Sequence, residues 1–199
     1  FKPKRKTRAG VAIEKGLSPL ADIILSQKNV SVSDEAIRFV DEEKGVSTSD
    51  DAVNGALDII SEIISDDADL RKKLYAEYSG YAYIVSVATD ENADTVYRNY
   101  YSYRELASTI PPHRLLALDR GEREQALKVS IEPDEQRILK YITKAYVKAD
   151  NECGRLVRTA CEDSYKRLLH PSLERRLRND LTERSCDSSM HTFSDNLRQ

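Results

Sequence analysis

Apolar residues recur along most of the chain at the spacing of one face of a helix. The clearest stretch runs from residue 53 to residue 64, where they fall three, four and seven positions apart: Val53, Ala56, Leu57, Ile60, Ile63 and Ile64. This periodicity predicts a helix with one buried stripe. Thr48 and Asp51 precede it at the spacing of a capping box, with Asp in place of the usual Glu. We therefore expect the helix to begin there.

The rest of the first half shows weaker helical patterns. Two short helices are expected before residue 25, interrupted at residues 16–19, where Gly and Pro occur. The next helix is expected to start at Ser31 or Ser33, and Lys44 with Gly45 would end it. Another helix is predicted from about Asp67.

Helical spacing returns in the last third of the chain. It begins after Pro133 and continues to residue 168. His170 and Pro171 are then expected to break or kink the helix, because proline lacks the N–H that a helix interior needs. Leucines after residue 172 predict a final long helix or a pair of helices.

One segment in the middle alternates with the period of a strand. Between residues 127 and 131, three apolar residues alternate with Lys128 and Ser130. Residues 81–87 are β-branched and aromatic, and they fit either a strand or a continued helix. The sequence thus predicts a mainly α-helical, multihelical fold with at most one small β element near residues 126–131. Residues 1–30, 31–110 and 111–199 are expected to form three segments, which could pack as one domain.

Composition places the chain among globular proteins. Its 199 residues include 31 basic and 34 acidic ones, and 40% are hydrophobic. No apolar run approaches the roughly 18 residues of a membrane span, so we expect no membrane association. Residues 1–8 are basic with no apolar run behind them, so no signal peptide is predicted, and a cytoplasmic location is expected. The chain begins with Phe rather than Met, which suggests a piece of a longer protein.

Charge is concentrated in patches that a net charge of −3 conceals. Residues 41–70 hold ten acids and one base, which could form a docking surface for a basic partner. Two basic clusters are candidates for nucleic-acid contact through counterion release. They are Lys2, Lys4, Arg5, Lys6 and Arg8, and Arg175, Arg176 and Arg178. A solvated connector and ion pairs on a helix surface are the alternatives, and we favour them.

Tyrosines form a further cluster, with eight of the eleven lying between residues 75 and 103. Exposed rings could stack on unpaired bases. Buried rings would instead hold this segment against the helices. Because the chain has no Trp and only three Phe, tyrosine has to serve as the large core aromatic, and we favour burial.

Residues for catalysis or metal binding are not evident. Cys153, Cys161 and Cys186 form no CxxC pair, and they are expected to be packing residues. His113 could act as a general base, but Asp119 alone is too little to orient it. Motifs for nucleotide or metalloprotease sites are absent from the sequence. We therefore predict no enzymatic activity, metal, cofactor or small-molecule substrate.

Five segments lie in order along the chain and share one resemblance. The most specific is IPPHRLLALDRGE at residues 110–122. The others are PKRKTRA with EKGLSPLA in residues 3–21, ALDIISE at 56–62, YRNY at 97–100, and PSLERR at 171–176 running on to NLRQ at 196–199. Together they resemble the Tex family of bacterial transcription accessory proteins. Within the most specific segment, Pro111, His113, Arg114, Arg120 and Gly121 are expected to be structural. Pro111 and Pro112 would set an extended lead into a short helix, and His113 and Arg114 could bond backbone carbonyls.

The resemblance implies a place within a larger protein. Tex-family members have an N-terminal helical region with a helix-turn-helix, a resolvase-like RNase H-type domain, helix-hairpin-helix modules and a C-terminal OB-fold that binds RNA. This chain resembles the helical region that follows the helix-turn-helix. Its expected role is that of a scaffold, with nucleic acid bound mainly through domains absent from this chain and the transcription machinery as a further candidate partner.

Overall fold

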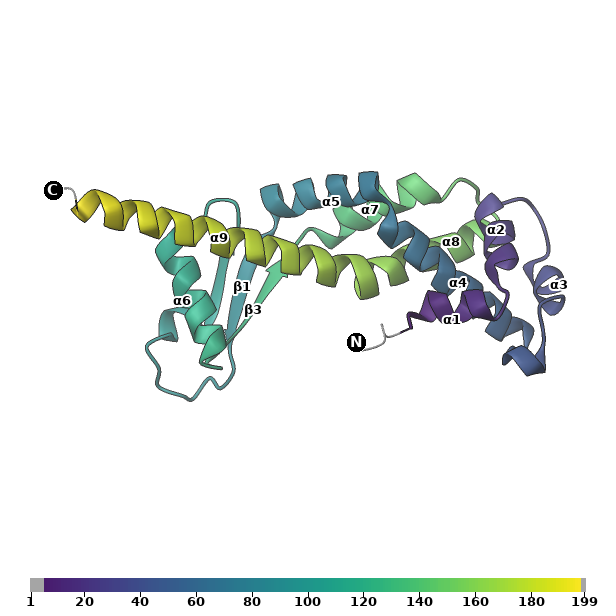
Figure 1. Cartoon of the computed structure of the whole chain (residues 1–199), viewed down its shortest axis with the longest axis horizontal. Coiled ribbons are helices and arrows are strands. Elements are labelled where there is room, and N and C mark those ends of the chain that lie inside the picture. The colour runs from purple at the N-terminus through teal and green to yellow at the C-terminus, as the bar shows by residue number, and fades with distance from the viewer. Residues whose placement is uncertain (1–5, 198–199) are drawn as a thin grey trace. The chain divides into compact units, whose positions relative to one another are not determined.

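The structure is a computed structural model that describes residues 6–197 (Figure 1). The described chain divides into two compact units, one made of residues up to 72 together with 139–170, the other of residues 73–138 together with those from 171 on. The predicted segments 31–110 and 111–199 each contribute to both units. Helices predominate and one small sheet is present, which confirms the predicted fold class.

The first unit is built around helix α4 (Ser49–Asp66), against which α1 (Arg8–Glu14), α2 (Ser18–Ser26), α3 (Val32–Ile37) and α8 (Glu152–Asp163) pack. The predicted capping box is present: Asp51 donates its N–H to Thr48 Oγ1 at 3.1 Å, and Thr48 donates its N–H to Asp51 Oδ2 at 3.1 Å. The apolar stripe of α4 supplies the buried Ala56, Ile60 and Ile64. The unit also contains the start of α5 (Ala68–Tyr81) and the end of α7 (Glu135–Tyr146).

The helix predicted between Ser31 and Lys44 is shorter than expected. Helix α3 ends at Ile37, and a 3₁₀ turn, η1 (Glu42–Lys44), follows it. Asp41 and Val46 form an isolated bridge around that turn, and Asp41 Oδ1 accepts the N–H of Glu43 at 3.0 Å. Gly45 was predicted to end the helix, and it ends the 3₁₀ turn instead. Its φ of 75° lies in the left-handed region, which glycine adopts readily.

The second unit contains an antiparallel sheet of order β2-β1-β3. Strand β3 (Leu127–Glu132) is the predicted strand, and β1 (Tyr83–Ala88) resolves the open interpretation of residues 81–87 in favour of a strand. Strand β2 (Ser102–Leu106) follows a 3₁₀ turn, η2 (Arg98–Tyr100), and was not predicted. Helix α6 (Pro112–Arg123) packs on β3, and α9 (His170–Leu197) also bonds to β3.

The expected helix break at His170 and Pro171 does not occur. Helix α8 leads directly into a π-helical stretch, η3 (Ser164–Leu169), which leads directly into α9. The N–H of His170 bonds to the carbonyl of Tyr165, five residues back, so the wider π turn accommodates the proline without ending the helix. The final segment is thus a single long helix. None of the helices in residues 6–197 has the length and apolar character needed to span a membrane.

Candidate nucleic-acid interface

The N-terminal basic cluster is described only in part. Lys2, Lys4 and Arg5 lie outside the described residues. Lys6 is exposed and forms an ion pair with Glu14 at 2.8 Å. Arg8 opens α1 and lines a cavity of about 310 Å³ together with Asp58 and Asp163. These two carboxylates offset the charge that Arg8 would present to a phosphate.

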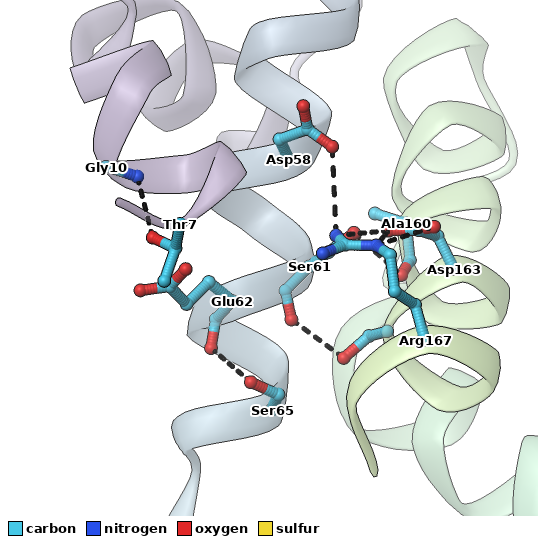
Figure 2. A network of polar contacts seen from close by, with 10 residues as sticks. Thr7, Gly10, Asp58, Ser61, Glu62, Ser65, Ala160, Asp163 and Arg167 are labelled. Carbon is cyan, nitrogen blue, oxygen red and sulfur yellow. Dashed lines mark hydrogen bonds and ion pairs between the residues drawn. The ribbon is translucent and has the colours of Figure 1, made fainter. Parts of the chain in front are cut away.

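The same part of the first unit holds a polar network centred on Arg167 (Figure 2). Arg167 bonds Asp163 through Nε and Nη2, with the shortest contact at 2.7 Å, and its Nη2 lies 3.7 Å from Asp58 Oδ1. The hydrogen bonds from Arg167 lower the pKa of Asp163. Burial raises the pKa of Asp58, although Arg167 and Arg8 oppose that shift. Arg167 is therefore an internal counterion, bound to residues of α4 and α8.

The second basic cluster contains one arginine that is enclosed by the fold. Arg178 Nη2 bonds Asp119 at 3.0 Å and Glu122 at 2.6 Å, and its Nη1 donates to the carbonyl of Val129 at 3.3 Å. The side chains of Arg178 and Asp119 are 16% and 13% exposed, which leaves little surface for a ligand. Thr182 donates a further bond to Asp119 at 2.8 Å. Arg178 therefore joins α9, α6 and β3.

The other two arginines of this cluster differ from each other. The guanidinium of Arg176 lies 3.8 Å from the centre of the Tyr75 ring, and Tyr75 donates a hydrogen bond to Asp180. Burial and this bond raise the pKa of Tyr75 to about 12. Arg175 is exposed. Arg176 Nε also lies 4.0 Å from Asp180 Oδ2. The ion pairs of Arg176 and Arg178 agree with the ion-pair interpretation, whereas a nucleic-acid role for the cluster stays a prediction.

The segment at residues 110–122 forms the start and body of α6. Pro111 is extended, with φ −65° and ψ 146°, and the helix begins at Pro112, as expected. His113 is exposed. Arg114 bonds the carboxylate of Glu105 at 3.1 Å, not a backbone carbonyl, so that part of the expectation is wrong. Glu105, on β2, lies within reach of Arg114 at the start of α6.

The end of the same segment packs closely on β3. A Cβ on Gly121 would lie 2.6 Å from Leu127 Cδ1, so glycine lets α6 approach the strand. Arg120 bonds Glu124 at 2.9 Å, and Glu124 accepts a bond from Tyr97 at 2.8 Å. Arg120 and Glu124 are 72% and 48% exposed, so this ion pair lies at the surface of the second unit.

Comparison with known proteins agrees with these segments. A family model described as Tex central region-like matches residues 27–193. The chain belongs to the Tex family. It is 41% identical over its whole length to the uncharacterized protein YdcI of Bacillus subtilis, and 32% identical over 99% of its length to protein YhgF of Escherichia coli. The transcriptional accessory protein Tex of Neisseria gonorrhoeae is 28% identical over the whole chain. The chain spans 27–28% of the length of these relatives.

Tyrosines of this Tex-family chain divide between core and surface. Burial is confirmed for Tyr78 and Tyr97, whereas Tyr81 is 59% exposed. Tyr83 lies under Arg104, with the guanidinium 3.4 Å from the ring centre. Tyr103 donates a hydrogen bond to Glu105, and burial with this bond raises the pKa of Tyr103 to about 12. The cluster therefore mixes core rings with partly exposed rings that have internal partners.

Two of the three cysteines of the Tex-family chain are packing residues, as expected. Cys153 and Cys161 are buried on α8, whereas Cys186 is exposed, so the expectation is wrong for Cys186. Burial raises the pKa of Cys161 to about 12, which keeps that thiol protonated and unreactive. No group of three or more potential metal ligands was found in the part of the chain that the structure describes.

Several acids of residues 41–70 are used within the fold. Asp41 and Asp51 cap helical turns, Asp58 faces Arg167, and Asp67 accepts bonds from the N–H of Leu70 and the hydroxyl of Tyr146. The exposed acids without such a role are Glu42, Glu43, Asp50, Asp66 and Asp69, and Asp51 is exposed as well. An acidic docking surface would thus be smaller than the sequence suggests.

Sequence reasoning missed a basic cavity in the Tex-family chain. The cavity measures about 390 Å³ and lies where the loop after α7 meets α8, and its lining includes Lys148, Asp150, Arg155 and Arg158. The only available signal was the spacing of Arg155 and Arg158, three residues apart on one helix face. Lys148 joins them through the fold of the loop.

Proposed function

We propose that this chain is a helical scaffold within a longer, cytoplasmic Tex-like transcription accessory protein. In this proposal the region has no catalytic activity, and RNA or DNA is bound mainly by other domains of the longer protein. The observation that carries the proposal is that arginines of the family-specific segments form ion pairs with acids of the chain itself, and that Arg178 among them is largely enclosed. Arg114, Arg120 and Arg178 each bond an acid of the same unit.

The comparisons support this role in two ways. A relative is named a transcriptional accessory protein, and the chain matches little more than a quarter of that relative's length. Nucleic acid and the transcription machinery are the partners that such a name suggests. The competing function is direct docking of a basic protein on the exposed acids of residues 41–70.

A pull-down with a Tex-family protein that contains this region separates the two functions. The scaffold proposal expects nuclease treatment to remove the captured partners, because nucleic acid bridges them. It also expects the variant Asp50→Lys/Asp66→Lys to capture as much as the unmodified protein. Glu183→Lys/Asp187→Lys is the matched control, because it makes the same charge change on exposed residues of α9. Partners that resist nuclease and are lost only in the first variant would establish docking instead.

A further inference from the structure

A rigid frame holds the basic cavity between the loop after α7 and helix α8. Gln27, at the end of α2, is buried, and its Oε1 accepts the N–H groups of Lys148 at 2.7 Å and Ala149 at 3.1 Å. Its Nε2 donates to the carbonyl of Tyr146 at 2.7 Å, and its own carbonyl accepts a bond from Asn151 at 2.8 Å. Four bonds from one residue thus fix the loop that carries Lys148.

The side chains around this cavity carry an excess of positive charge. Lys148, Arg155 and Arg158 are exposed, and within residues 6–197 none of the three takes part in an ion pair. Asp150 is the acid among the lining residues. The cavity beside Arg8 differs, because Asp58 and Asp163 offset its single arginine there. Excess cationic charge in a preformed hollow favours an anionic ligand.

Chemistry favours phosphate as that anion. Two guanidinium groups three residues apart on one helix face can each bond a phosphate in the bidentate manner, and a nearby lysine adds a point charge. We infer that Lys148, Arg155 and Arg158 form a contact site for the phosphate backbone of a nucleic acid. The inference rests on the proposed function in one respect: that function makes nucleic acid the polyanion that meets this region. The contact is independent of sequence, because phosphates carry no base identity.

The test is a titration of fluorescently labelled single-stranded RNA of 20 nucleotides with the 199-residue chain, read by anisotropy at several salt concentrations. Arg155→Gln/Arg158→Gln removes two phosphate contacts, and each contact to a single strand contributes about −0.7 to the slope of log K against log salt. The slope of the double variant should therefore be shallower by about 1.4. If the variant and the unmodified chain extrapolate to the same affinity at 1 M salt, the variant should bind roughly 25-fold more weakly than the unmodified chain at 0.1 M salt. Asp150→Asn should have the opposite effect and strengthen binding.

Matched controls separate a local site from a general charge effect. Lys72→Gln/Lys73→Gln removes two exposed positive charges from α5, and Asp187→Asn removes an exposed acid from α9. We expect both controls to change affinity less than threefold. Equal losses in the two double variants, or no RNA binding by the unmodified chain at low salt, would overturn the inference. Competition by polyglutamate but not by unlabelled RNA would do so as well, because the site would then bind an acidic protein. None of these outcomes depends on how tightly other domains bind, so the proposed function is judged separately.

Discussion

Replacing Gly154 by Ala should destabilise the chain by roughly 3 kcal/mol or more. A Cβ at this position would lie 1.9 Å from the carbonyl oxygen of Ala149 and 2.9 Å from its carbonyl carbon. Both obstructing atoms are backbone, and the loop that holds them is fixed by its bonds to Gln27. The substitution therefore has to displace the loop or the first turn of α8. Asn151, which caps α8 by accepting the N–H of Gly154 at 2.9 Å, would lose that bond in the process.

Gly80 provides the matched control for this prediction. It also lies in a helix, α5, but a Cβ there would meet no atom within 4 Å. Gly80→Ala should therefore raise the free energy of unfolding by up to about 1 kcal/mol, since Ala has the higher helix propensity. Urea unfolding followed by circular dichroism measures both effects. A Gly154→Ala variant as stable as the unmodified chain would show that the loop does not approach α8 as described.

The second large effect is expected at Arg178. Its replacement by Ala leaves the largely enclosed Asp119 with the hydroxyl of Thr182 but without a counterion, and leaves the carbonyl of Val129 without its bond. Breaking a buried ion pair in this way costs about 3–5 kcal/mol, and the 41% exposure of Glu122 places the expected loss near 3 kcal/mol. The unfolding midpoint in urea should fall accordingly.

Arg175 is the control for Arg178, because it lies on the same helix, carries the same charge and is exposed. Arg175→Ala should change stability by less than about 0.5 kcal/mol. Arg178→Lys should recover only part of the loss, since an ammonium lacks the fork that reaches both acids. If Arg175→Ala and Arg178→Ala prove equally stable, the Arg178 network contributes little to the second unit.

Local signals in the sequence predicted the features that depend on a few neighbouring residues. The capping box at Thr48 and Asp51, the alternation that became β3 and the extended Pro111 all depend on contacts within a few positions. Each was found where expected. Strand β2 was missed because its pairing with β1 is set by distant residues, and its own sequence is mostly polar.

Features that join distant parts of the chain were beyond the reach of these patterns. Each of the two units is built from two separate stretches of the sequence. No local pattern shows which later helix packs in the same unit as an earlier one. The helix continues through Pro171 because a π turn precedes it, and none of the sequence patterns described above predicts a π turn. Proline alone favoured a break.

The candidate site shows the same limit. Adjacent basic residues drew attention to Arg175, Arg176 and Arg178, yet Arg178 faces acids from α6, more than fifty residues earlier. Lys148, Arg155 and Arg158 were overlooked because they are separated along the chain and interspersed with other residues. The hydrogen bonds of Gln27, about 120 residues earlier in the chain, hold the loop that carries Lys148 beside α8. A charge is available to a ligand only when the fold leaves it without a partner.

We propose that this region supports nucleic-acid binding that is mainly supplied elsewhere in the longer protein. The most direct measurement compares the affinity of the 199-residue chain and of a full-length relative, the Bacillus subtilis protein YdcI, for the same labelled RNA at physiological salt. We predict a dissociation constant for the chain in the nonspecific range of about 10⁻⁴–10⁻⁶ M, and binding by the full-length protein that is at least roughly tenfold tighter. Equal affinities would contradict the claim, because this region would then be the main nucleic-acid site.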